Sequence, residues 1–365
     1  MDPRTRKMAD VLVNYCVGVK PGEWVMVQGG YLGIPLATEC VRAILQAGGH
    51  PTTRLGAEEI REALFLYGSD EQVGYIDPAA QVTSDQVDVT IGIIAPENTR
   101  AAAGIDPAKL AAQGKAMEPL METMMRRTAD GSLRWTGCAY PTQAGAQDAG
   151  MSLREYEDFV YGAGLINEDD PVAAWKAQGE RQQRIADWLG GKSEVHITGP
   201  DTDLKVGIEG RTWLNDDGHL NFPGGEVFTG PVETATEGTI QFTFPGFYQG
   251  REVGGIRLQF KGGRVVDASA TSDEAFLTQM LDMDEGARVL GEFAIGLNPG
   301  IQRFTKNTLF DEKIGGTLHM ALGRSYPETG GKNVSALHWD MVFDLKEAEV
   351  TVDGELFSRN GEFCV

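Results

Sequence analysis

Two hydrophobic patterns alternate along the first half of the chain. Short apolar runs typical of buried strands are separated by stretches that place apolar residues at helical spacing. The apolar runs are 23–28, 51–55 and 87–95, and the helical stretches are 35–47, 107–127 and 152–189. Strands that alternate with helices favour βαβ units and a parallel sheet. The sequence therefore predicts an N-terminal α/β domain.

Beyond about residue 190 the pattern changes to short strands separated by Gly, Asp and Asn turns. VHITG, DLKVGI, GTIQFTF, IRLQF and RVVDASA follow one another, and Asp353-Gly354 is a two-residue hairpin signal. One helix is expected from Asp273 to Gly291, with acids in its first turn. We predict a boundary near residue 190, between an α/β domain (1–190) and a β-rich α+β domain (191–365).

The glycines of GGYLGIP, residues 29–35, follow a predicted strand and precede a predicted helix. Their order is GGxxG rather than the GxGxxG of dinucleotide loops, and an isolated glycine motif is a weak signal. A tight turn is the favoured interpretation.

Histidines and acids interrupt the apolar strands of the second half. His319 lies in TLHMALG, and His338 and Asp340 lie two residues apart in SALHWDMVF. Residues i and i+2 of a strand point to the same face, so His338 and Asp340 would form a pair of metal ligands or an acid/base pair. Each histidine alone could be an ordinary core residue. Together, and with Glu312 nearby, they indicate a functional site.

Two further acids lie in apolar or glycine-rich surroundings. Glu226 follows a glycine turn and precedes Val227 and Phe228, and Glu292 lies in LGEFAIG. An ionised carboxylate in an apolar environment is costly unless it is paired, binds a metal or reaches the surface. The alternatives are an exposed turn for Glu226 and a solvated helix end for Glu292.

These side chains supply nitrogen and oxygen ligands without thiolates. Such a set suits zinc, cobalt, manganese or magnesium better than a soft metal or an iron–sulfur cluster. Six candidates exceed what one ion with an open coordination position needs, whereas two ions bridged by a carboxylate would use them. Two-metal sites activate water and polarise a carbonyl or phosphoryl group.

The chain is strongly acidic, with a formal net charge of -21. This charge disfavours nucleic acid and anionic membranes as partners, because both require basic patches. Four scattered cysteines without a CxxC pair indicate neither a disulfide framework nor a structural zinc site. No signal peptide or membrane span is recognised. A reducing cytoplasm is the expected location.

Several linked segments of the second half resemble those of the thermophilic-type metalloaminopeptidases, peptidase family M29, in the same order. They are GGEVFTGP, TEGTIQFTFP, LGEFAIGLNP, DEKIGGTLHMALGRSYP, GGKNVSALHWDM and VDGELFSRNGEF. The resemblance is strong over roughly residues 220–363, and in the N-terminal half it is limited to general α/β character. It implies two divalent ions per chain (zinc, cobalt, magnesium or manganese), held by Glu226, Glu292, His319, His338 and Asp340.

By the same resemblance, Glu292 would bridge the two ions, Glu312 would be a ligand or an outer-shell acid, and Tyr326 would stabilise an oxyanion. The activity implied is that of a homodimeric aminopeptidase acting on peptide substrates, with Glu312 as the proton shuttle if it is not a ligand. Two alternatives remain. His319, His338 and Asp340 alone would suit the single Fe(II) of a ring-cleaving dioxygenase. The same scaffold could also serve a non-catalytic binding protein.

Overall fold

The computed structural model describes residues 2–102 and 104–365. The chain forms two compact units, Met1–Ala173 with Gly218–Pro223, and Ala174–Asp217 with Gly224–Val365. The second unit thus begins before residue 190, because the helix α9 (Pro171–Leu189) places Ile185, Ala186 and Leu189 in that unit's core. The division into separate domains near residue 190 stays a prediction. Among the described residues, none of the helices combines the length and apolar character that crossing a membrane requires.

The N-terminal unit is built on a five-stranded sheet in the order β2-β1-β3-β4-β8. Every pairing in it is parallel, which confirms the predicted parallel sheet. Its strands are β1 (Trp24–Gly30), β2 (His50–Gly56), β3 (Val89–Ile94), β4 (Arg134–Ala139) and β8 (Asn221–Phe222). Its helices are α1 (Pro3–Val11), α2 (Ile34–Gln46), α3 (Glu58–Tyr67), α4 (Asp70–Val73), α5 (Pro78–Gln86), α6 (Pro107–Ala129), α7 (Gln143–Asp148) and α8 (Leu153–Ala163).

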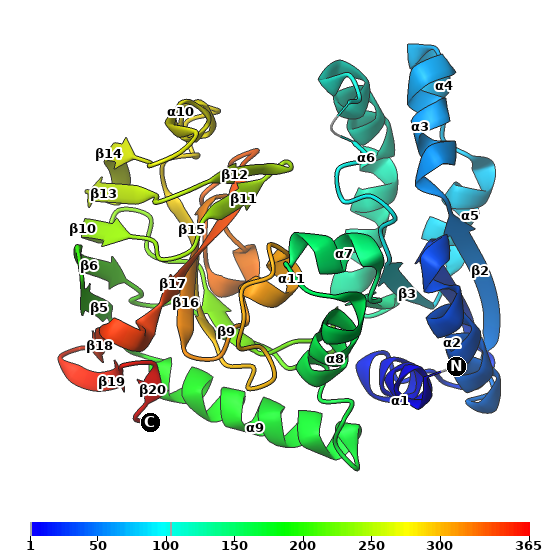
Figure 1. The fold of residues 1–365 in the computed structure, drawn as a ribbon, viewed down its shortest axis with the longest axis horizontal. Helices are drawn as coiled ribbons and strands as arrows, with labels where there is room; N and C mark the ends of the chain where they lie inside the picture. The colour runs from blue at the N-terminus through cyan, green and yellow to red at the C-terminus, as the bar shows by residue number, and fades with distance from the viewer. Residues whose placement is uncertain (1, 103) are drawn as a thin grey trace. The chain divides into compact units, whose positions relative to one another are not determined.

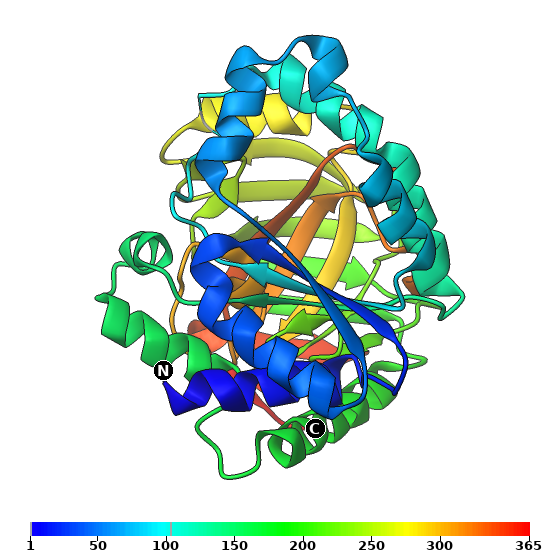
Figure 2. The same cartoon turned by 90° about the vertical axis from the view of Figure 1, so that its right-hand side faces the viewer.

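Helix α2 contacts β1 and β2 and packs against α1 (Figure 2). It buries Leu36, Cys40 and Ile44, the side chains at helical spacing that predicted it. Packing explains why glycines occupy positions 29 and 30, before this helix. A Cβ on Gly29 would lie 2.0 Å from the carbonyl oxygen of Ile93 on β3, and one on Gly30 would lie 2.4 Å from that of Ala95. The tight turn expected at these glycines is therefore wrong for Gly29 and Gly30, which end strand β1 and must be glycine for close backbone approach.

The C-terminal unit contains two larger antiparallel sheets (Figure 1). An eight-stranded sheet has the order β14-β13-β10-β6-β5-β18-β19-β20, and a five-stranded sheet has the order β17-β16-β15-β9-β7. The strands of the first are β5 (Glu194–Gly199), β6 (Thr202–Gly207), β10 (Thr236–Gln241), β13 (Arg257–Lys261), β14 (Arg264–Ser269), β18 (Glu349–Val352), β19 (Glu355–Arg359) and β20 (Glu362–Phe363). Those of the second are β7 (Leu214–Asp216), β9 (Glu226–Thr229), β15 (Leu290–Gly296), β16 (Thr317–Gly323) and β17 (His338–Asp344). A separate hairpin joins β11 (Gly246–Tyr248) to β12 (Arg251–Val253).

A single apolar core joins the two sheets of the C-terminal unit. Side chains such as Ile197 and Leu258 enter it from the eight-stranded sheet, and Phe293, Met320 and Met341 enter it from the five-stranded sheet. Two largely apolar faces packed in this way remove a large area from water, the main favourable term in folding. One face of the five-stranded sheet is therefore fixed as the inner face.

The predicted helix from Asp273 to Gly291 is correct only in its first half. Helix α10 spans Glu274–Leu281, and from Leu290 the chain is strand β15. A side chain at Gly286 would meet the carbonyl oxygen of Val334 at 2.2 Å, and the residues from Leu290 onward pair with β16. Tertiary pairing thus overrides the local helical pattern. A short helix, α11 (Thr308–Asp311), precedes β16.

Candidate metal centre

The register of the five-stranded sheet collects the predicted ligands on one face. Ala321 of β16 pairs with Glu292 of β15 on one side and with Asp340 of β17 on the other. His319 and His338 lie two residues from Ala321 and Asp340, so they share that face. Glu226 joins the row through β9, where it pairs with Gly296 of β15. Four adjacent strands thus present five ligand-type side chains together.

The intervening residues on the same strands point the other way. Phe293, Met320 and Met341 alternate with the polar positions and lie in the apolar core. Glu226 and Glu292 are each only 5% exposed and His319 is 0% exposed. The exposed turn considered for Glu226 and the solvated helix end considered for Glu292 are therefore wrong. Both acids are buried on strands.

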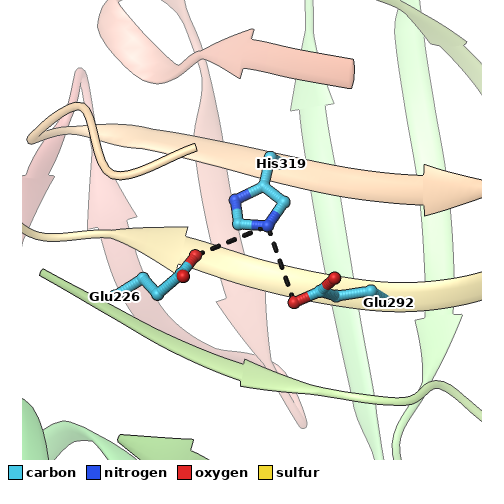
Figure 3. Close-up of side chains that lie close together, drawn as sticks. All are labelled: Glu226, Glu292 and His319. Atoms are coloured by element: carbon cyan, nitrogen blue, oxygen red, sulfur yellow. Dashed lines mark ion pairs between the residues drawn. The ribbon is translucent and has the colours of Figure 1, made fainter. Parts of the chain in front are cut away.

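Glu292 lies between the two histidines. Its Oε1 is 3.7 Å from His319 Nε2, and its Oε2 is 3.2 Å from His338 Nε2. Glu226 Oε2 is 3.5 Å from His319 Nε2, and Asp340 Oδ1 is 3.6 Å from His338 Nε2. Figure 3 shows the His319 ring directing Nε2 toward the carboxylates of Glu226 and Glu292. Glu292 thus approaches both histidines, one with each carboxylate oxygen.

Backbone carbonyls orient both histidine rings. Nδ1 of His319 lies 2.9 Å from the carbonyl oxygen of Glu312, and Nδ1 of His338 lies 2.9 Å from that of Arg324. A carbonyl can only accept, so each Nδ1 donates its hydrogen. In the neutral ring, Nε2 then carries the lone pair and faces the carboxylates. This arrangement is common for histidines that bind metals.

The donor atoms fit divalent cations. Glu226 Oε2, His319 Nε2 and Asp340 Oδ1 are buried and have no hydrogen-bond partner among the described residues, although buried polar atoms normally have one. Ligand atoms lie within 4.8 Å of one another in three groups: Glu226, Glu292 and His319; Glu292, His338 and Asp340; and Glu312, His319 and Asp340. A hard cation at each of two overlapping groups would satisfy these atoms.

In the absence of cations, burial and the closely spaced acids shift the pKa values of the site residues. Burial raises the pKa of Glu226 and that of Asp340. Burial opposes protonation of the histidines, but Glu292 and its neighbouring acids raise the pKa of His319 to about 10 and that of His338 to about 9. The site thus attracts positive charge, either as protons or as metal ions.

Glu312 lies at the edge of this group. It follows α11, and its carboxylate contacts the ammonium group of Lys313, which in turn lies 3.1 Å from Glu226 Oε1 and 3.6 Å from Asp216 Oδ2. The sequence analysis missed Lys313 and Asp216. The available signal was a lysine directly beside Glu312 and just before an apolar strand, but a lysine in such a turn is usually exposed.

The helix α9, which lies within the predicted helical stretch 152–189, also supports the site, but the role of its Gln182 was not predicted. Gln182 is fully buried, and its side-chain amide donates to the backbone oxygens of Asp216 and Glu226 at 2.9 and 3.2 Å. A glutamine in an amphipathic helix gives no sign of this role in the sequence. Its hydrogen bonds fix the first residue of β9.

Tyr326 lies three residues beyond the end of β16. Its ring contacts those of His338 and Phe228 edge to face, with centroids 5.4 and 5.3 Å away. Although Tyr326 is 39% exposed, partial burial of its phenol and the charges of Glu292 and Asp340 raise its pKa. The phenol is therefore protonated at neutral pH and can donate a hydrogen bond beside the site.

Comparisons with known proteins show the family to which the chain belongs. The chain is 29% identical to Aminopeptidase 2 of Geobacillus stearothermophilus, covering 95% of this chain and 93% of the relative. It is 32% identical to Aminopeptidase T of Thermus aquaticus, covering 67% and 66%. The solved structure of wild-type AmpT from Thermus thermophilus covers 100% of this chain and 99% of its own, with a TM-score of 0.86 at 24% identity, and confirms the fold. The model of the thermophilic metalloprotease (M29) family matches residues 1–363. The chain is therefore a member of the thermophilic metalloprotease family M29.

Proposed function

We propose that this protein is a metalloaminopeptidase that removes N-terminal residues from peptides at a centre of two divalent ions. The observation that carries the proposal is the convergence of five ligand-type side chains on one sheet face, those of Glu226, Glu292, His319, His338 and Asp340. Buried donor atoms of three of them, Glu226, His319 and Asp340, have no hydrogen-bond partner among the described residues. Family membership supports metal-dependent peptide hydrolysis, and the names of the relatives support aminopeptidase action.

In this proposal Glu226 and His319 would hold one ion, His338 and Asp340 would hold the other, and Glu292 would contribute to both. When bound, two divalent cations such as zinc, cobalt, magnesium or manganese supply an activated water and polarise the scissile carbonyl. The carbonyls of Glu312 and Arg324 keep the histidine rings in the orientation that binding requires.

In the proposed reaction, Tyr326 would stabilise the developing negative charge and Glu312 would transfer a proton. Tyr326 donates its hydroxyl hydrogen to the oxygen that becomes negative when the peptide carbonyl is attacked. Glu312 accepts the proton released by the attacking water and passes it to the leaving amine. Its side chain is only 15% exposed, which keeps this transfer away from bulk water. The acids of the site also offer a counter-charge for the substrate's α-amine.

The dioxygenase alternative requires two histidines and one carboxylate around a single iron. Here Glu226 and Glu292 stand in the same site, each within 3.7 Å of His319. The relatives found are named aminopeptidases, and no observation favours the dioxygenase or a non-catalytic binding protein. This ligand set therefore fits a two-metal hydrolase better than a single-iron dioxygenase.

The test compares free and blocked substrates. Protein reconstituted with zinc or cobalt should release leucine from leucyl-anilide and from short peptides, and should fail on their N-acetylated forms, because acetylation removes the basic α-amine. Turnover should require neither oxygen nor ferrous iron. Oxygen uptake with Fe(II) and no release of amino acids would refute the proposed function.

The homodimer implied by the family resemblance also belongs to this proposal. Light scattering of the purified protein measures its mass directly. A mass of twice 39.5 kDa is expected, and a monomer at micromolar concentration would contradict it.

A further inference from the structure

A completely buried lysine stands beside the candidate metal centre. The side chain of Lys313 is 0% exposed, and its ammonium group forms ion pairs with Asp216, Glu226 and Glu312. Removing a charged lysine from water is costly unless its partners compensate. Three surrounding carboxylates provide that compensation, so the lysine and the acids form one arrangement.

The two oxygens of Glu226 have different surroundings. Oε1 lies 3.1 Å from Lys313 Nζ. Oε2 lies 3.5 Å from His319 Nε2 and has no hydrogen-bond partner among the described residues. A carboxylate held by one oxygen cannot rotate freely, and its other oxygen keeps a fixed direction. Lys313 thus decides which oxygen of Glu226 faces the centre.

Glu312 is fixed at both its side chain and its backbone. Its carboxylate contacts Lys313, and its backbone carbonyl accepts a hydrogen bond from His319 Nδ1 at 2.9 Å. The residue that orients His319 is therefore itself anchored by Lys313. Through Glu312, Lys313 thus also affects the orientation of His319, a second proposed ligand.

The charges agree with this arrangement. Among the described residues, five buried or half-buried carboxylates lie within ion-pair distance of Lys313 or of the two histidines, on Asp216, Glu226, Glu292, Glu312 and Asp340. One ammonium group and two divalent cations together balance their five negative charges. A neutral assembly is the least costly one in a buried site.

We propose that Lys313 is a positioning residue, which holds Glu226 and Glu312 so that Glu226 and His319 are aimed at one metal ion. This inference rests on the metal centre proposed above. It predicts an effect opposite to simple electrostatics. Removing a nearby positive charge would by itself tighten cation binding, whereas losing the orientation of Glu226 weakens it.

The experiment titrates the metal-free protein with Co(II), followed by visible absorption and elemental analysis. Wild type should saturate at two ions. Lys313→Met should bind one ion at least about tenfold more weakly, the scale of a lost outer-shell partner, and should show an altered cobalt spectrum. Lys313→Arg, which keeps the charge, should recover part of the affinity. Lys346→Met, at an exposed lysine paired with Asp344, is the matched control and should behave as wild type.

A double-mutant cycle tests the route of the effect. In a Glu226→Gln background, Lys313→Met should weaken cobalt binding much less than in wild type, because the group it positions is already altered. Full additivity, unchanged binding, or tighter binding in Lys313→Met would each overturn the inference. So would failure of both Lys313→Met and Lys313→Gln to fold at saturating cobalt, since the lysine would then be purely structural. Failure of the proposed function is separate, because it would appear in wild type as a single ion and no peptide hydrolysis.

Discussion

At the scale of single residues, Glu292 has the central position. It contacts His319 through one oxygen and His338 through the other. Burial alone would raise the pKa of Glu292, but the two histidines lower it. The residue is therefore a carboxylate at neutral pH, with both oxygens directed at groups of the site. A bridging ligand between two cations needs this combination of charge and placement.

Glu292→Gln keeps the shape of the side chain and removes its charge. Two cations would then repel each other without a shared carboxylate between them, so we expect the variant to retain one ion and to lose almost all turnover. Circular dichroism should show an intact fold. Glu349→Gln, at a surface glutamate paired with Arg359, is the control. Normal activity with two bound ions in Glu292→Gln would show that this carboxylate is dispensable.

Tyr326→Phe separates transition-state stabilisation from metal binding. Removing a hydrogen-bond donor to an oxyanion lowers kcat about 100- to 1000-fold in hydrolases, and we expect a loss of this size. The ring contacts with His338 and Phe228 survive the change, so metal content should stay constant. A parallel loss of metal would instead assign Tyr326 a role in holding His338.

At the scale of elements, the decisive property is the alternation along β16. Leu318, Met320 and Leu322 point into the apolar core, while His319 and Ala321 point to the opposite face. Ala321 lies directly between Glu292 and Asp340 on the neighbouring strands. A small residue at this point leaves room for the converging ligands. The same strand thus builds the core and the site.

Ala321→Leu should fill the space between Glu292 and Asp340. We expect weaker metal binding, measured by competition with a chelator, and an unfolding free energy lowered by about 1–3 kcal/mol, typical of overpacking. Met320→Leu, one residue away on the core face, conserves volume and should cost less than about 1.5 kcal/mol without affecting metal binding. Equal effects of the two variants on metal binding would contradict the assignment of faces.

In the N-terminal unit, an ion pair joins Glu23, the residue before β1, to Arg134, the first residue of β4. Arg134 Nη2 lies 2.6 Å from Glu23 Oε2. Although burial opposes it, hydrogen bonds from Arg134 and from the Lys20 amide lower the pKa of Glu23 below its ordinary value of 4.5. A group with a lowered folded pKa stabilises the fold above the unfolded pKa, and this contribution is lost as the pH falls through the folded value.

Glu23→Gln should therefore reduce the unfolding free energy by about 1.5–3 kcal/mol at pH 7, the scale of a hydrogen bond to a charged group. The difference from wild type should shrink as the pH falls below about 4.5, the ordinary pKa of glutamate. Urea unfolding at several pH values measures it. Glu62→Gln, at an exposed residue, should change little at any pH. A difference that does not depend on pH would rule out the ion pair as its source.

At the scale of the whole molecule, the proposed metal ligands all belong to the C-terminal unit. A ligand that binds only the folded state stabilises it by about 4 kcal/mol when present at 1,000 times its Kd. Bound cations should therefore raise the stability of this unit directly. The parallel sheet of the N-terminal unit contains none of the proposed ligands.

Removing the metal with a chelator should lower the unfolding temperature and increase hydrogen exchange in β9, β15, β16 and β17. Exchange in β1, β3 and β4 should change much less. Restoring zinc or cobalt should reverse the effect, and sodium chloride at equal ionic strength is the control. Uniform exchange across both units would show that the cation stabilises the molecule in another way.

The sequence by itself determined the periodicities and the ligand chemistry. Alternation of strands and helices predicted the parallel sheet, and the i, i+2 spacing of His338 and Asp340 placed them on one face, because both properties depend only on local backbone geometry. Acids and histidines among apolar residues indicated a metal site without reference to the fold, since burying them alone is costly.

Only the tertiary structure decided which distant residues meet. Glu226 lies near Glu292 because β9 pairs with β15. The predicted helix up to Gly291 does not form at its end, where the chain is strand β15 from Leu290 onward. Lys313 is buried rather than exposed because Asp216, Glu226 and Glu312 surround it. These facts follow from strand order and register, which are set by hydrogen bonds and packing between segments far apart in the chain. Local patterns do not encode such partners.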